Sequence, residues 1–106
     1  PISNLKRMKV KKRAQAGSFE SSDILVIIEP VEENTGRVIE LDSNVMLQFG
    51  ESILAEITQM LDKFNISDVK LIVQDKGALH PTICARVETA LRRSLGIEEG
   101  TLLSND

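Results

Sequence analysis

The sequence predicts a two-layer α+β domain in which two helices cover one face of a three-stranded mixed sheet. Three short apolar segments with strand-like composition lie at 24–28, 37–43 and 69–74. Two longer segments, 44–64 and 80–95, repeat apolar residues at the helical period of about 3.6. The order is therefore β-β-α-β-α, which is typical of a small α+β fold.

The first strand is an unbroken apolar run from Ile24 to Ile28, closed by Glu29-Pro30. Such a run indicates a strand that is buried on both faces and central in its sheet. Residues 31–36 have the composition of a turn, and 37–43 then alternates apolar with acidic residues. We expect these two strands to form a hairpin.

The first helix is predicted from Asn44 to about Phe64, with a Ser43 or Asn44 cap and Asn65 in a left-handed conformation at its end. Gly50 interrupts the apolar stripe, which suggests that another element crosses closely there. The stripe contains the following residues: Met46, Phe49, Ile53, Ile57, Met60, Leu61 and Phe64.

The third strand, 69–74, is followed by the turn 75–77 and by a helix that starts at His80-Pro81 and ends at Gly96. A crossover helix joins the second and third strands, so we expect these to run parallel. The apolar first strand should lie between them, giving the order 2-1-3 with both helices on one face. Alternation then leaves an uncovered apolar patch that we expect to contact a larger partner subunit, formed by Leu25, Ile27, Val38 and Ile72.

This pattern divides the chain into three parts. Residues 1–22 are expected to be a flexible basic N-terminal arm, 23–96 a single α+β domain, and 97–106 a C-terminal tail. Met8 followed by Lys9-Val10 resembles a natural chain start, so we expect residues 1–7 to be an added segment.

Composition places the protein in the cytoplasm and away from membranes. No apolar run approaches the roughly 18 residues of a membrane-spanning helix, and the N-terminus lacks the apolar region of a secretory signal. A single cysteine cannot form an internal disulfide, which agrees with a reducing compartment.

Charge is distributed unevenly along the chain. Six of the thirteen basic residues lie within residues 6–13. The rest of the chain has seven basic and sixteen acidic residues, so its net charge is 7 − 16 = −9. A small nucleic-acid-binding or regulatory adaptor that uses the basic arm is therefore one alternative. No aromatic residue lies among these charges to stack on a base, so nucleic-acid binding is the weaker interpretation.

Three hydroxyls lie between the basic arm and the first strand, at Ser18, Ser21 and Ser22. The only histidine, His80, and the only cysteine, Cys84, are far away in sequence, so no nucleophile can be built around these serines. We interpret His80 as a helix-start residue and Cys84 as a core residue. No spacing of carboxylates indicates a metal site, and we predict no catalytic residue. A serine without a base more plausibly carries a covalent group, although a turn or capping role is the simpler alternative.

The octet from Ala16 to Asp23 resembles the attachment segment of the acyl carrier (gamma) subunit of citrate lyase. The resemblance continues through Gln-Phe-Gly at 48–50 and Asp-Lys-Gly-Ala-Leu at 75–79, and it covers about residues 8–96. Many members have glycine where Ser22 stands and aspartate where His80 stands.

The resemblance implies a non-catalytic carrier that bears 2'-(5''-phosphoribosyl)-3'-dephospho-CoA on Ser21, attached by a dedicated enzyme. The thiol of this arm would carry acetyl and citryl groups between the citrate lyase alpha subunit (acyl transferase) and beta subunit (citryl lyase), so that citrate yields oxaloacetate and acetate. Glu20 and Asp23 would then contact the attaching enzyme. The carrier subunit of malonate decarboxylase, which bears the same kind of arm, is the alternative within this class.

Overall fold

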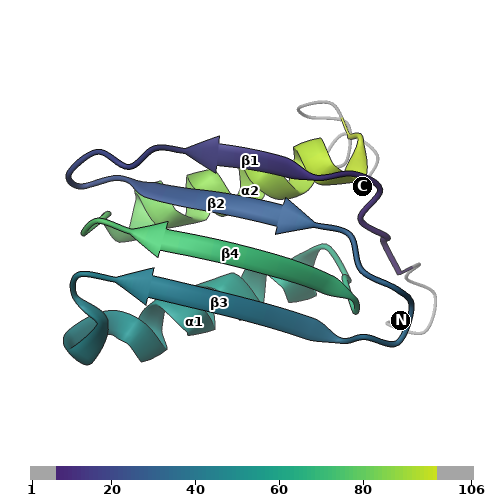
Figure 1. Cartoon of the computed structure of the whole chain (residues 1–106), viewed down its shortest axis with the longest axis horizontal. Coiled ribbons are helices and arrows are strands. Elements are labelled where there is room, and N and C mark those ends of the chain that lie inside the picture. The colour runs from purple at the N-terminus through teal and green to yellow at the C-terminus, as the bar shows by residue number, and fades with distance from the viewer. Residues whose placement is uncertain (1–6, 98–106) are drawn as a thin grey trace.

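A four-stranded sheet forms one layer of the molecule, and both helices lie behind it as the second layer (Figure 1). The computed structural model describes residues 7–97, and none of its helices is long and apolar enough to cross a membrane. The elements in chain order are β1 Ala14–Gly17, β2 Ile24–Glu29, β3 Arg37–Ser43, α1 Met46–Lys63, β4 Val69–Asp75 and α2 His80–Leu95. The α+β class and the two helices on one face are as the sequence predicts.

The sheet has four strands in the order β1-β2-β4-β3, so the predicted three-stranded 2-1-3 sheet is wrong. β4 lies between β2 and β3, antiparallel to β2 and parallel to β3. The expected hairpin between 24–28 and 37–43 therefore does not form, while the parallel crossover through α1 is confirmed. Burial gives the reason: Val69, Leu71 and Val73 are fully buried, whereas Ile39 and Leu41 of β3 are only half-buried, as suits an edge strand.

The additional strand, β1, comes from the segment that the sequence predicts to be a flexible arm. Ala16 pairs with Val26 in an antiparallel hairpin, and its side chain is buried. Further upstream Val10 is buried in the core, and Met8 forms a bridge to Ile66. Residues 8–17 thus belong to the domain, and the expected boundary at residue 22 places a strand of the sheet outside it. Of the expected tail, 97–106, only Ile97 is described, and it packs against the core, while residues 98–106 lie outside the described residues.

The core is the layer between the sheet and the helices. β2 and β4 contribute every second side chain to it, and α1 and α2 contribute one apolar face each. The largest fully buried members include Ile24, Ile28, Leu71, Ile57, Leu61, Phe64 and Leu91. The predicted α1 stripe extends too far toward the helix start, because Met46 and Phe49 are exposed.

The helix ends follow the predicted signals in part. α1 begins at Met46 after Val45, and the Ser43 hydroxyl accepts a hydrogen bond from the Val45 N–H. Asn65 (φ 56°) and Gly96 (φ 73°) adopt the left-handed conformation expected after α1 and α2. The crossing element expected at Gly50 is not seen, since the nearest atoms to a Cβ built there belong to Met46 in the same helix.

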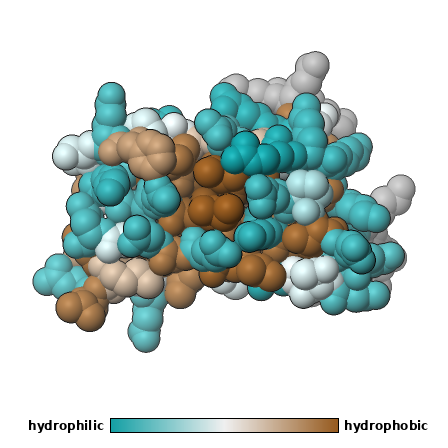
Figure 2. Space-filling view, in the orientation of Figure 1, coloured by the Kyte–Doolittle hydropathy of each residue, from teal (hydrophilic) through white to brown (hydrophobic). Residues whose placement is uncertain are grey.

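Within residues 7–97, no helix covers the other face of the sheet. Ile27 pairs with Ile72 on this face, as the alternation predicts, and both are half-buried. Figure 2 shows a brown apolar area in the middle of this face, surrounded by hydrophilic side chains. Leu25 is only 6% exposed, so the accessible apolar area is smaller than expected. Contact of this face with a partner stays a prediction.

Candidate attachment site

The loop 18–23 connects β1 to β2 at the same end of the molecule as the β3–α1 and β4–α2 connections (Figure 1). Two backbone hydrogen bonds tie it to the β4–α2 connection: the Ser22 N–H donates to the Lys76 carbonyl (2.8 Å), and the Lys76 N–H donates to the Asp23 carbonyl (2.9 Å). Phe49 and Ala78 line one groove nearby. The fold thus brings the three segments that carry the resemblance to one end of the domain.

Asp23 fixes the shape of this loop. Its carboxylate accepts hydrogen bonds from the Ser18 hydroxyl (2.7 Å), the Ile24 N–H (2.7 Å) and the Arg86 guanidinium (3.0 and 3.2 Å). The hydrogen bonds from Ser18 and Arg86 are the main reason that the pKa of Asp23 falls from 3.8 to about 2. The Asp23 carboxylate is therefore occupied by hydrogen bonds within the protein. Of the two acidic residues expected to contact the attaching enzyme, Glu20 and Asp23, only Glu20 is exposed.

The three serines of the loop differ in how their hydroxyls are used. The Ser18 hydroxyl donates to Asp23 and accepts from the Glu20 N–H (3.2 Å), so it holds the turn together. The Ser22 hydroxyl is exposed and also has no hydrogen-bond partner among residues 7–97, but its backbone has φ 64°, a conformation that favours glycine. Ser21 is exposed, and within residues 7–97 its hydroxyl has no hydrogen-bond partner. Among the three, the Ser21 hydroxyl is the accessible one on an ordinary backbone.

Replacing Ser22 by glycine should leave stability unchanged to within about 1 kcal/mol, because glycine adopts the positive φ without strain but gains freedom in the unfolded chain. The loop would keep its Ser22–Lys76 backbone bond. Urea unfolding of the Ser22→Gly and Ser22→Val variants checks this. The valine variant should be the less stable, since β-branched residues are strained at positive φ; equal stability of the two would contradict the backbone argument.

Replacing Asp23 by asparagine should destabilise the protein by about 2 kcal/mol near neutral pH, because charge-assisted hydrogen bonds to Ser18 and Arg86 are lost. The pKa of the Asp23 carboxyl in the folded protein lies below its ordinary value of 3.8. The ionised carboxylate therefore stabilises the fold above about pH 4, and this contribution is lost as the pH falls from about 4 to 2. Urea unfolding from pH 7 to 2 should show the gap between the two proteins closing over that range. Glu51→Gln, an exposed position on α1, is the control that should show no such gap.

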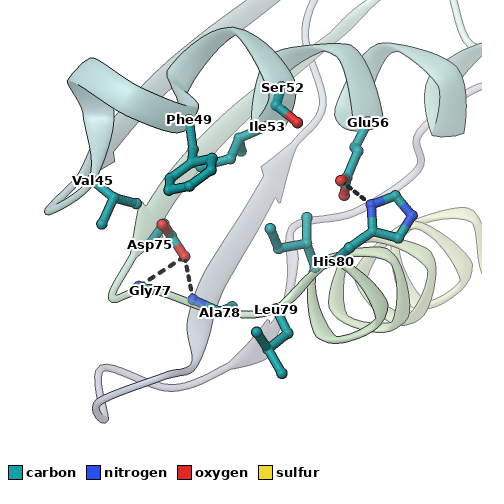
Figure 3. A pocket seen from close by; sticks show the side chains of 11 residues that line it. Val45, Phe49, Ser52, Ile53, Glu56, Asp75, Gly77, Ala78, Leu79 and His80 are labelled. Atoms are coloured by element: carbon teal, nitrogen blue, oxygen red, sulfur yellow. Dashed lines mark hydrogen bonds and ion pairs between the residues drawn. The ribbon is translucent and has the colours of Figure 1, made fainter.

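Beside the loop, a groove of about 350 Å³ lies between α1 and the β4–α2 connection (Figure 3). Asp75 shapes this connection, since its buried carboxylate accepts hydrogen bonds from the Gly77 and Ala78 N–H groups (3.2 and 2.9 Å) and from the Ser43 hydroxyl (2.7 Å). The groove is lined by Val45, Phe49, Ser52, Ile53, Glu56, Asp75, Gly77, Ala78, Leu79, His80 and Ile83.

One cluster at the edge of this groove is not foreseen from the sequence. His80 is the first residue of α2, as expected, and it contacts the carboxylate of Glu56 on α1 (Figure 3). Cys84 is half-buried one turn further along α2, with its sulfur 3.8 Å from Glu56 Oε2. The interval of four residues between His80 and Cys84 is visible in the sequence, but Glu56 is 24 residues from His80 and joins them only through the packing of the helices.

The profile of the ACP family, described as malonate decarboxylase delta subunit (MdcD), matches residues 11–94. The citrate lyase acyl carrier protein of Latilactobacillus sakei is 45% identical over 92 residues, covering 87% of this chain and 89% of the relative. The citrate lyase acyl carrier protein of Treponema denticola is 44% identical over 87 residues, covering 82% of this chain and 97% of the relative.

Among solved structures, the fold is similar to a chain in the crystal structure of a Pseudomonas malonate decarboxylase hetero-tetramer in complex with malonate. The TM-score is 0.69 with 18% identity, covering 82% of this chain and 88% of that chain. This likeness supports the four-stranded fold, while the sequence matches extend through all three segments gathered around the loop 18–23. The chain therefore belongs to the acyl carrier protein family that contains the citrate lyase acyl carrier proteins and the malonate decarboxylase delta subunit.

Proposed function

We propose that this chain is the acyl carrier subunit of citrate lyase, catalyses no step itself, and bears its prosthetic group on Ser21. The observation that supports this most is the contrast within one anchored loop: Ser18 is hydrogen-bonded, Ser22 has a strained backbone, and the Ser21 hydroxyl is exposed and free of partners among the described residues. An attaching enzyme needs such a hydroxyl to form a phosphodiester.

The proposed group is 2'-(5''-phosphoribosyl)-3'-dephospho-CoA, whose terminal thiol carries the acyl group. On the alpha subunit the acetyl thioester would exchange with citrate, releasing acetate and leaving a citryl thioester. On the beta subunit the citryl thioester would split into oxaloacetate and the acetyl thioester. A covalent arm keeps the intermediate at high effective concentration near both sites. We place this assembly in the cytoplasm, where the free thiol stays reduced.

The malonate decarboxylase carrier is the second candidate, since that family's profile matches residues 11–94. Citrate lyase is favoured because several relatives with 40–45% identity carry that name, whereas the malonate decarboxylase chain is 18% identical.

The test is to co-express the chain with the enzymes that make and attach the group, and then to measure intact mass and map the modified peptide. The thiol of the loaded protein is acetylated with acetic anhydride, and the protein is then mixed with either citrate lyase alpha and beta subunits or malonate decarboxylase subunits. We expect an adduct of several hundred daltons on Ser21 and restored citrate cleavage. Restored malonate decarboxylation alone would support the second candidate, and an unmodified chain would support the adaptor alternative.

The same end of the domain carries exposed apolar side chains that suit contact with the enzyme subunits. Leu47 is fully exposed, and Phe19, Phe49 and Leu79 are more than half exposed. They lie in or beside the three connections at the end that holds Ser21 (Figure 1). A subunit that receives the arm must approach this end.

Replacing Leu47 and Leu79 together by glutamate should weaken binding to the enzyme subunits by at least about tenfold, because exposed apolar anchors carry much of an interface's energy. Stability should change by less than about 0.5 kcal/mol, since both side chains are exposed. Titration against the purified subunits measures this. Glu33→Lys in the loop before β3 is the control; equal binding of the double variant and the control would contradict this docking end.

A further inference from the structure

We propose that Glu56, His80 and Cys84 bind one zinc-type divalent cation, at a site separate from the attachment of a group to Ser21. His80 and Cys84 lie one turn apart on α2, so their side chains project from the same side of that helix. Glu56 faces them from α1. One nitrogen, one sulfur and one carboxylate oxygen of the three residues lie within 4.8 Å of one another.

The distances at the cysteine match a tetrahedral site. Zinc–sulfur bonds of about 2.3 Å and zinc–nitrogen or zinc–oxygen bonds of about 2.0–2.1 Å place neighbouring ligand atoms roughly 3.6 Å apart. The Cys84 sulfur lies 3.7 Å from His80 Nε2 and 3.8 Å from Glu56 Oε2. One ligand atom from each of the three residues lies within 4.8 Å of the other two, close to the separation that a shared tetrahedral ion requires.

The donor set selects the class of cation. One thiolate, one imidazole and one carboxylate suit zinc and similar borderline metals, whereas calcium and magnesium prefer shells made of oxygen alone. Three protein ligands leave a fourth tetrahedral position for water or another ligand. The cluster lies at the edge of the groove, where His80 and Glu56 face each other (Figure 3).

The Glu56 carboxylate beside Cys84 favours a cation at this place, since its Oε2 atom lies 3.8 Å from the Cys84 sulfur. Burial and the Glu56 carboxylate, with a smaller contribution from Glu88, raise the pKa of the Cys84 thiol, while Lys63 acts weakly in the opposite direction. A divalent cation supplies the missing positive charge, and as it binds the thiol becomes a thiolate and one proton leaves to solvent.

The three proposed ligands differ in how exposed their side chains are. The Glu56 side chain is 11% exposed and the Cys84 side chain is half-buried, so the packing of α1 against α2 fixes both. The His80 side chain is 68% exposed, so an ion can reach the site from solvent and then bind the imidazole. Pro81 in the first turn holds the start of α2 and with it the position of His80.

Cobalt titration of the full chain, purified reduced and without a histidine tag, tests the site. We expect one Co²⁺ per chain, the visible bands of tetrahedral cobalt, and a near-ultraviolet band from thiolate-to-cobalt charge transfer. Calorimetry in buffers with different ionisation enthalpies should show release of about one proton. Zinc should displace the cobalt and remove these bands.

The variants identify the ligands. Cys84→Ser should abolish the charge-transfer band, and His80→Gln and Glu56→Gln should each weaken binding by at least about tenfold. Circular dichroism confirms that each variant is folded, and Glu51→Gln on the outer side of α1 is the matched control with unchanged binding. A wild-type chain that binds no cobalt, or binds it without the thiolate band, would show that the cluster is only a hydrogen-bonding network and would overturn the proposal. Unmodified Ser21→Ala protein should bind cobalt like wild type, which separates this test from that of the carrier function.

Discussion

Replacing Ser21 by alanine is expected to abolish loading of the chain, so that intact mass after co-expression with the attaching enzymes matches the unmodified protein. The reason is that the covalent bond needs the hydroxyl, and neither neighbouring serine offers an equivalent one. The Ser18 hydroxyl is held by Asp23 at 2.7 Å, and the Ser22 hydroxyl, although exposed, lies on a backbone with positive φ. Citrate cleavage by the reconstituted enzyme should fall to background, because in the proposed cycle the arm carries every intermediate.

The fold of the Ser21→Ala protein should be unaffected, with a change in unfolding free energy within about 0.5 kcal/mol, since the side chain is exposed and has no hydrogen-bond partner among residues 7–97. Ser22→Gly is the matched control and should load normally. Peptide mapping that finds the group on Ser22 or Ser18 of the unaltered protein would refute the assignment. Loading that persists in Ser21→Ala would do the same.

The turn that holds the proposed attachment site can be predicted from the sequence, because its conformation depends on residues within the turn. Ser22 occupies a left-handed position, and the Asp23 carboxylate accepts a hydrogen bond from the next backbone N–H. What the sequence does not reveal is the partner of Asp23, because Arg86 is 63 residues away and reaches the loop only when α2 packs behind the sheet.

The predicted strand order is wrong for a different reason. The sequence shows correctly that β3 and β4 are parallel, but both β2 and β4 are strongly apolar, and composition alone does not decide which of them is paired on both sides. β1 is missed because Ala14–Gly17 contains only small residues and one glutamine, without the β-branched or aromatic side chains that mark strands. Its place depends on close approach to β2, which small residues permit.

Replacing Gly17 by alanine is expected to destabilise the protein by at least about 3 kcal/mol and to lower its melting temperature by more than about 12 °C. A Cβ at this position would lie 1.7 Å from the backbone carbonyl oxygen of Ile24, and the backbone has φ +91°. The obstructing atom belongs to the neighbouring strand, so a side-chain rotation cannot relieve the clash. β1 must separate from β2 or the turn must be remade.

Gly36→Ala separates the clash from the backbone strain. Gly36 has a similar φ of +85°, but no atom of residues 7–97 lies within 4 Å of a Cβ built there, so this variant should lose only about 1 kcal/mol of stability. Urea unfolding of both variants measures the difference, and equal losses would contradict the close approach of β1 to Ile24. Gly17 begins the turn that presents Ser21. We therefore expect the attaching enzyme to load the Gly17→Ala variant more slowly than the wild type, at temperatures where the variant is still folded. Gly36→Ala, at the opposite end of the sheet, should be loaded at the wild-type rate.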